Sequence, residues 1–238
     1  MNNRYILVGA TLILAMVALV FTVRVIRPAA NIAKVTDESL KTKGPRDAKI
    51  QIVEFSDFEC PACRQAADYV RQLMTAYPGK IHFTFKHFPL KSHRWSPIAH
   101  AAVECAARLD SFWEYHDMLY AYQPEWVASQ NPTETFFRFA KDLGFNLDNF
   151  SACLEEQSVK DLIRKERLEG ESLQLQATPT FFVNGERLVG PVEFKVKAEA
   201  IVRKALELTE SGTSIINNES SPESLAEVQE KLGFGGLN

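Results

Sequence analysis

Two cysteines separated by two residues carry the strongest chemical signal in the chain, in the run Glu59-Cys60-Pro61-Ala62-Cys63-Arg64. Such a pair can be half of a zinc site, a haem-attachment site or a redox-active pair. Haem attachment needs a histidine directly after the second cysteine, where this chain has Arg64. A zinc site needs two further ligands at a suitable spacing, and the other two cysteines stand alone, 48 residues apart. These spacings favour redox chemistry and predict no metal site.

The residues around the pair predict a strand, a helix and a second strand. Residues 50–55 and 81–88 are rich in β-branched and aromatic side chains, as is typical of strands. Residues 60–76 have helical spacing, with Pro61 suited to the first helical position and a Pro-Gly pair after the end. The cysteine pair therefore lies where the first strand passes into the helix.

This position favours a reactive thiol at Cys60. At the cap of the helix its sulfur would face unpaired backbone N–H groups and the positive end of the helix dipole, which stabilise a thiolate. Cysteines in such places have pKa values of roughly 3.5 to 7.5, against about 8.5 for a free thiol. Cys63 lies one turn further into the helix, where we expect it to be more buried and to act as the resolving thiol.

The rest of the chain predicts an α/β protein with a helical block inside it. Helical spacing continues through residues 97–176, and a short strand follows at residues 180–183. Asn184-Gly185 is a strong signal for a two-residue hairpin. A return strand at residues 187–189 and a helix at 193–208 complete the predicted domain.

The amino-terminal segment predicts a transmembrane helix. Residues 5–23 carry no charge and would form a helix of about 28 Å, close to the thickness of a bilayer core. A cleaved signal peptide is the alternative, although the apolar stretch is longer than usual for one. We therefore expect an anchor at residues 1–27, a linker at 28–48, and a flexible tail at 211–238.

Composition and charge narrow the function classes. Hydrophobic residues make up 46% of the chain and charged residues 24%, which excludes a globally disordered protein. The whole chain carries −3 and its first 35 residues +4, so the remainder carries −7. A folded part this acidic argues against nucleic acid as a partner.

The residues around the cysteine pair are similar to the active-site segment of the DsbA-like thiol–disulfide oxidoreductases, which have a thioredoxin fold with a helical insertion. The resemblance spans about residues 48–206 and rests on four separated motifs in the family's order. They are Val53-Glu54-Phe55-Ser56-Asp57-Phe58-Glu59-Cys60-Pro61-Ala62-Cys63, Lys86-His87-Phe88-Pro89-Leu90, Phe112-Trp113-Glu114-Tyr115-His116 and Ala177-Thr178-Pro179-Thr180-Phe181-Phe182-Val183-Asn184-Gly185. The resemblance implies a thioredoxin-like domain at residues 49–210, with its helical insertion at about 96–176.

The resemblance also implies roles for single residues. Cys60 matches the family's nucleophile and Cys63 its partner, so the Cys60–Cys63 disulfide carries the two electrons and no cofactor is needed. Pro179 matches the cis-proline beside that disulfide. The backbone of Thr178 would pair with an extended substrate peptide as an added strand. Glu54 matches the buried acid that takes or relays the proton of Cys63, although a strand carboxylate can also simply bind a neighbour.

Between the two cysteines, Pro61 and Ala62 are expected to contact substrate. Neither carries an ionisable group, so helix N–H groups would have to provide most of the stabilisation of the thiolate. This predicts a milder oxidant than an active site with histidine in the motif.

Cys105 and Cys153 have two possible states. They can be two buried free thiols, or a structural bridge, which an oxidising compartment favours. Closing so long a loop would stabilise the fold by roughly 4 kcal/mol, against about 2 kcal/mol for the four-residue loop of the active-site pair. A bridge between them would therefore be the structural one, and the Cys60–Cys63 bond the labile one.

These observations predict a membrane-anchored thiol–disulfide oxidoreductase that acts as an oxidase on exported proteins containing cysteine. Its catalytic domain would lie in the periplasm or another extracytoplasmic space, where a membrane redox partner would reset the active-site disulfide. If the amino-terminal segment is cleaved, the protein would instead be secreted to the periplasm. The alternatives are an isomerase or reductase of the same fold, an exported thiol protein that binds a soft metal such as Cu(I), and a holdase chaperone.

Overall fold

The computed structural model describes residues 39–219. The predicted anchor at residues 1–27 lies outside these residues, as does the end of the predicted tail, 220–238. Within residues 39–219, none of the helices combines the length and the apolar composition that a membrane span requires.

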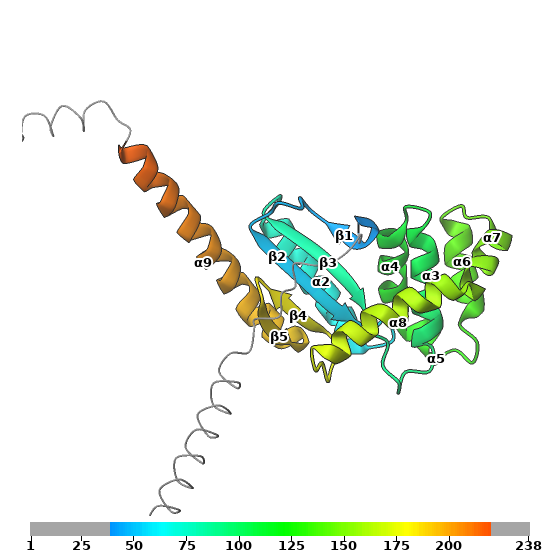
Figure 1. Ribbon diagram of the computed structural model, residues 1–238. Helices are drawn as coiled ribbons and strands as arrows, with labels where there is room; N and C mark the ends of the chain where they lie inside the picture. Colours follow the sequence, from blue (N-terminus) through cyan, green and yellow to red (C-terminus); the bar gives the residue numbers. More distant parts are fainter. Residues whose placement is uncertain (1–38, 220–238) are drawn as a thin grey trace, which may run out of the picture. The chain divides into compact units, whose positions relative to one another are not determined.

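The centre of the domain is a five-stranded sheet in the order β1-β3-β2-β4-β5 (Figure 1). Its strands are β1 (Thr42–Lys43), β2 (Ile50–Ser56), β3 (Ile81–His87), β4 (Thr180–Val183) and β5 (Glu186–Val189). The central strand β2 is parallel to β3 and antiparallel to β4. All residues of β2 except Gln51 are buried, as expected for a strand covered on both faces.

The hairpin between β4 and β5 turns at the predicted dipeptide. Asn184 and Gly185 have φ angles of 48° and 87°, which is the backbone region that a two-residue turn of this kind requires. The turn pairs β5 with β4 at the edge of the sheet. Because β4 is antiparallel to β2, with Thr180 opposite Phe55, the residues before β4 lie at the end of β2.

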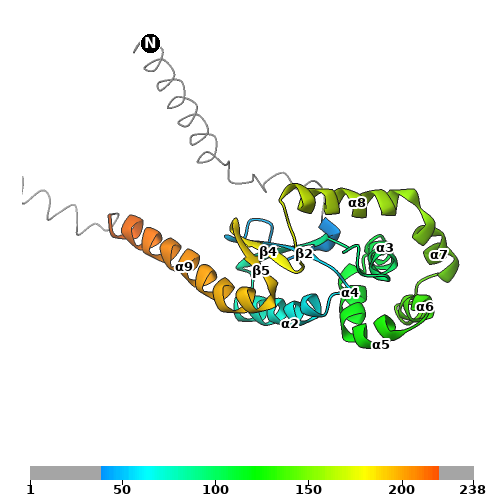
Figure 2. The ribbon, with the colours of Figure 1, turned by 90° about the horizontal axis from the view of Figure 1, so that it is seen from below.

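Helices cover both faces of the sheet (Figure 2). On one face α2 (Pro61–Ala76) packs against α9 (Gly190–Glu219), and α9 contacts β4 and β5. On the other face α8 (Gln157–Ser172) contacts β3. Helix α2 buries one stripe, at spacings of three, four and three residues: Cys63, Ala66, Val70 and Leu73.

The helical insertion consists of α3 (Ser96–Ala107), α4 (Phe112–Ala121), α5 (Gln123–Ala128), α6 (Thr133–Asp142) and α7 (Leu147–Glu155), followed by α8. Together these helices span Ser96–Ser172. A disulfide joins Cys105 of α3 to Cys153 of α7, with their Cα atoms 5.9 Å apart. The strand-helix-strand unit and the insertion confirm the thioredoxin-like α/β fold.

The ordered domain extends beyond its predicted boundaries at both ends. Residues 39–43, assigned to the linker from the sequence, form the short helix η1 (Ser39–Lys41) and strand β1. A strand of two residues is too short to show a hydrophobic period, so no sequence pattern indicated it. At the other end, α9 continues to Glu219, past the predicted start of the tail at residue 211.

Candidate active site

Cys60 occupies the cap of α2, as the spacing predicted. Its backbone is extended, with φ −77° and ψ 120°, and Pro61 follows in the first helical turn. The N–H groups of Cys63 and Arg64 donate to the carbonyl of Cys60 at 3.1 and 3.2 Å. Cys60 keeps 7% of its surface exposed and Cys63 keeps none, and both are free thiols in this structure. Pro61 is exposed and Ala62 half-buried, so the first turn of α2 forms the rim of the site.

The environment of Cys60 favours its thiolate. A hydrogen bond from the Cys63 thiol is the largest effect and helps to lower the pKa of Cys60 to about 6, against the opposing effect of burial. Contacts with Thr178 and with the backbone N–H groups of Cys63 and Ala62 lower it further. The helix N–H groups therefore contribute, but the partner thiol contributes more, so the expectation that these groups provide most of the stabilisation was wrong.

The environment of Cys63 favours the protonated thiol instead. Burial, followed by its hydrogen bond to Cys60 and the negative charge there, raises the pKa of the Cys63 thiol well above its ordinary value. The N–H of Asp57 points at its sulfur over 3.4 Å. Of the two thiols, only Cys60 is ionised near neutral pH.

Thr178, in the segment before β4, lies next to Cys60, although the two residues are 118 positions apart in the sequence. The peptide bond between Thr178 and Pro179 is cis. The Cys60 sulfur contacts the carbonyl oxygen of Thr178 at 3.5 Å. Among the described residues, the buried hydroxyl of Thr178 has no hydrogen-bond partner. The structure thus places Thr178 in contact with Cys60, and Pro179 directly beside it in sequence.

Glu54 lies in the middle of β2 and is 2% exposed. Ser56 donates a hydrogen bond of 2.6 Å to its Oε1 atom. Burial raises the pKa of Glu54 to about 8, although the Ser56 hydrogen bond opposes this. The side chain is therefore mostly a neutral acid at pH 7 and holds a proton that it could donate.

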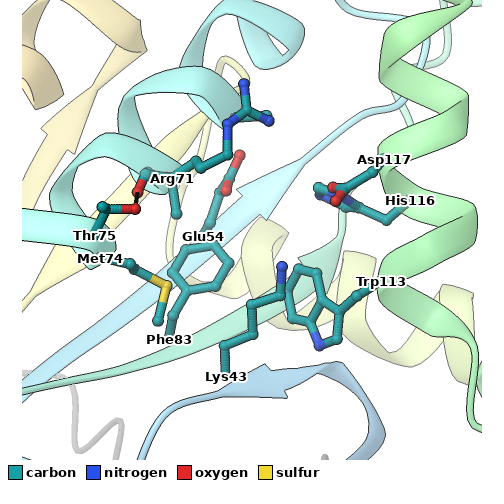
Figure 3. Close-up of a pocket in the computed structure, with 11 residues that line it drawn as sticks. Lys43, Glu54, Arg71, Met74, Thr75, Phe83, Trp113, His116 and Asp117 are labelled. Atoms are coloured by element: carbon teal, nitrogen blue, oxygen red, sulfur yellow. Dashed lines mark hydrogen bonds and ion pairs between the residues drawn. The ribbon is translucent and has the colours of Figure 1, made fainter. Parts of the chain in front are cut away.

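A pocket of about 270 Å³ lies over Glu54 (Figure 3). Its walls come from β1, α2, β3 and α4, and include Lys43, Arg71 and Asp117. Arg71 and Asp117 are exposed, so the pocket reaches the surface of the domain. The buried acid therefore borders a pocket that opens to the surface.

Sequence reasoning missed Asp57, which organises the loops around the site. Its carboxylate is fully buried and accepts hydrogen bonds from the backbone N–H groups of Glu59 and Leu90, the Ser96 hydroxyl and the His93 ring, at 2.7 to 2.9 Å. Burial alone would raise the pKa of Asp57, but hydrogen bonds and charge, led by those of His100, hold it well below its usual range. In the sequence, the position of Asp57 three residues before Cys60 was the feature that could have indicated its role.

A chain of buried polar groups continues from Asp57, and sequence reasoning missed it as well. His100 Nε2 lies 3.7 Å from Asp57, and the Nδ1 atoms of His100 and His87 are 2.6 Å apart. His87 then meets Glu104 at 3.1 Å. Burial holds the pKa of His87 well below its ordinary value. Spacing could not reveal this contact, because the two histidines come from β3 and α3.

Within residues 39–219, no group of three or more His, Cys, Asp or Glu side chains is arranged to hold a metal ion. The predicted site residues Cys60, Cys63 and Thr178 come together at one end of the sheet. Glu54 lies below them, connected through Ser56 and not by direct contact with Cys60.

Comparison with known proteins agrees with this geometry. A family model described as Thioredoxin matches residues 37–203. Among curated proteins, the chain is similar to the Na(+)/H(+) antiporter NhaA 3 of Salinispora tropica, with 35% identity over 161 residues. That match covers 67% of this chain and 24% of the relative, so the chain spans about a quarter of the relative's length.

Solved structures share the fold. The chain is similar to BdbD of Bacillus subtilis in its oxidised form, with a TM-score of 0.62 and 23% identity, covering 70% of this chain and 92% of that one. It is also similar to the thiol-disulfide exchange protein alpha-DsbA2 of Wolbachia pipientis, with a TM-score of 0.59 and 21% identity, covering 72% and 88%.

Proposed function

The chain belongs to the thioredoxin family and has the fold of the DsbA-like thiol–disulfide oxidoreductases, and from this premise we propose that it oxidises thiols of exported proteins through the Cys60–Cys63 pair. The observation that carries the proposal is the opposite state of the two thiols. The pKa of Cys60 is lowered to about 6 at the cap of α2, where 7% of its surface is exposed, and the pKa of the fully buried Cys63 is raised.

The reaction starts from the Cys60–Cys63 disulfide. A substrate thiolate attacks the sulfur of Cys60, a mixed disulfide forms, and Cys63 leaves with the electron pair and takes up a proton. A second substrate thiolate then attacks the substrate sulfur of the mixed disulfide, and Cys60 leaves as a thiolate. The substrate has lost two electrons and two protons, and the enzyme is left reduced.

The lowered pKa of Cys60 supports this direction. A thiol of low pKa is a good leaving group, so release of the oxidised substrate is fast. A stabilised Cys60 thiolate also stabilises the reduced enzyme, which makes the disulfide a stronger oxidant. Burial raises the pKa of Cys63 and makes its thiolate a poor leaving group, so the departing sulfur has to take up a proton.

Substrate would bind across the rim formed by α2 and the cis-proline segment. The backbone of Thr178, whose carbonyl lies 3.5 Å from the Cys60 sulfur, would pair with an extended peptide. Exposed Pro61 and half-buried Ala62 would contact the peptide from the other side. In this arrangement a substrate sulfur next to Thr178 reaches Cys60 and not Cys63.

The predicted amino-terminal anchor would hold the domain at the outer face of a membrane, beside a membrane redox partner that reoxidises Cys60 and Cys63. Substrates would be exported proteins with cysteine pairs, in a periplasmic or similar space. Localisation of a carboxyl-terminal fusion, compared with a variant that lacks residues 1–27, tests this part.

Oxidative refolding of a reduced, disulfide-containing client tests the activity. Wild type is expected to turn over, Cys60→Ser to be inactive, and Cys63→Ser to accumulate a mixed disulfide. Failure of wild type in refolding, with faster rearrangement of a scrambled client, would instead indicate an isomerase. Equimolar Cu(I) retained by the reduced protein and lost in Cys63→Ser, without turnover, would indicate a metal-binding protein.

The redox potential, measured against glutathione, tests the strength of the oxidant. The Pro61-Ala62 dipeptide adds no ionisable group beside Cys60, so we expect a potential below that of DsbA, about −120 mV. A value at or above that potential would contradict the prediction, since every 30 mV corresponds to about 1.4 kcal/mol for this couple.

A further inference from the structure

Ser56 lies between the resolving thiol and the buried acid. Glu54 and Ser56 are two residues apart on β2, so their side chains share one face of the strand. The Ser56 hydroxyl lies 2.6 Å from Oε1 of Glu54. The backbone N of the next residue, Asp57, lies 3.4 Å from the Cys63 sulfur, and the Ser56 side chain lowers the pKa of that thiol. Ser56 is completely buried, so bulk water cannot take its place in this contact.

Tyr120 fixes the position of that hydroxyl. Its phenol oxygen lies 3.0 Å from Ser56 Oγ and comes from α4, in the helical insertion. Tyr120 is buried, which raises the pKa of its phenol well above the ordinary value, so it stays protonated throughout the working range. It is therefore a positioning residue and holds Ser56 between its two partners.

From this geometry we propose that Ser56 relays the proton between Glu54 and Cys63 during disulfide exchange. The inference rests on the proposed function and adds a residue to its chemistry. When the Cys60–Cys63 bond breaks, Cys63 leaves as a buried thiolate. Ser56 donates its proton to that sulfur and receives one from the Glu54 carboxyl group. The products are a neutral Cys63 thiol, an intact Ser56 hydroxyl and a Glu54 carboxylate, so proton and charge balance.

The pocket over Glu54 provides a route by which water can return the proton to the carboxyl group. The charged and titratable groups around Glu54 are Lys43 of β1, Arg71, Cys60 and Cys63 at α2, and His116, Asp117 and Tyr120 of α4. The residues paired with Glu54 on β3 and β4 are the apolar Phe85 and Phe181. Figure 3 shows the Glu54 side chain between α2 and α4, with Arg71 on one side and His116 and Asp117 on the other. The acid can therefore recover its proton without opening of the active site.

Single-turnover kinetics test the relay. The oxidised protein is mixed with a reduced dithiol peptide from pH 5 to 9, and the loss of the Cys60–Cys63 disulfide is followed by rapid quench. Proton transfer by a positioned side chain typically contributes about 10²- to 10⁴-fold, so Ser56→Ala is expected to be slower by about a hundredfold or more. Its rate, normalised to peptide thiolate, should also lose the titration near pH 8 that Glu54 gives the wild type.

Four further variants separate a relay from a packing role. Ser56→Thr keeps the hydroxyl and should recover the rate to within about threefold of wild type. Glu54→Gln should be slow alone and add nothing in the Ser56→Ala background, because the two residues act in series. Tyr115→Phe removes a buried phenol that donates to the carbonyl of Phe136, away from the site, and serves as the matched control for Tyr120→Phe.

The results that overturn the inference differ from those that overturn the proposed function. If wild type exchanges but Ser56→Ala has the same rate and pH profile, the relay is wrong and the enzyme remains. Multiplicative losses in the double variant, or a Ser56→Thr variant as slow as Ser56→Ala, would also exclude it. If wild type does not exchange with thiols at all, the proposed function fails, and the relay with it.

Discussion

The Cys63 thiol donates a hydrogen bond to the Cys60 sulfur and does more than any other group to lower the pKa of Cys60 to about 6. The same contact raises the pKa of Cys63. One hydrogen bond thus separates the two thiols into a nucleophile and a buried acid, and only one proton leaves the pair near neutral pH.

This relationship predicts the effect of replacing Cys63. In Cys63→Ala the donor is lost, and the pKa of Cys60 should rise by one unit or more. In Cys63→Ser a hydroxyl can still donate, so the pKa should rise less. The rate of alkylation by iodoacetamide from pH 4 to 9 measures both values. Equal pKa values in Cys63→Ala and wild type would show that the helix terminus and Thr178 suffice.

Glu54→Gln is expected to change the pH dependence of stability. The pKa of Glu54 is raised to about 8 from an ordinary 4.5, so the folded state holds a proton that the unfolded state releases. The contribution of the neutral acid is complete below pH 4.5 and is lost as pH rises towards 8. The neutral amide of the variant avoids that loss. Relative to wild type, the free energy of unfolding of Glu54→Gln should therefore rise by several kcal/mol as pH goes from 4.5 to 8.

Urea unfolding at pH 4.5 and pH 8 measures this gain. Glu114→Gln, which changes an exposed carboxyl group on α4, is the matched control and should show no comparable gain. A constant difference between Glu54→Gln and wild type at the two pH values would contradict the raised pKa.

Removing the disulfide between α3 and α7 is expected to lower the free energy of unfolding and to leave the reactivity of Cys60 unchanged. Cys105 and Cys153 are 48 residues apart, and opening such a loop costs roughly 4 kcal/mol of unfolding free energy. The double variant Cys105→Ala/Cys153→Ala should lose about that amount in guanidinium unfolding. Its alkylation profile at Cys60 should match that of wild type, and a shifted profile would tie the bridge to the site.

Asp57→Asn is expected to destabilise the domain by about 3 kcal/mol or more, because it leaves several buried donors facing an amide. The pKa of Asp57 lies well below its usual range, so its contribution is complete above the ordinary aspartate pKa. It is lost progressively as pH falls below that ordinary value towards the lower pKa of the folded state. The deficit should therefore be the same at pH 5 and pH 8. Urea unfolding measures it, with the exposed Asp142→Asn as control, and a deficit that halves by pH 5 would contradict this account.

The sequence predicted those parts of the site that depend on residues close to one another in the chain. Pro61 and the helical period after it placed Cys60 at the cap of α2, whereas Glu54 was identified by its match to the buried acid of the family. The Asn184-Gly185 dipeptide predicted the hairpin that brings β5 alongside β4. In each case the signal lies within a few residues of the feature.

The missed contacts join residues that are far apart in the sequence. Tyr120 meets Ser56 across 64 residues, and His93 and Ser96 reach Asp57 from a loop and helix more than 30 residues away. Hydroxyl and imidazole groups suit many environments, so their types do not indicate their partners. Only the packing of the helical insertion against the sheet selects them.

The buried ammonium group of Lys41 determines where a recombinant fragment of the domain can begin. It lies 2.5 Å from Glu166 and 3.5 Å from Glu104, in helices α8 and α3. A recombinant fragment that starts at residue 49 would leave two buried carboxyl groups without their cation and an uncovered edge on β3. Truncations intended for crystallisation or activity assays should therefore start before Ser39.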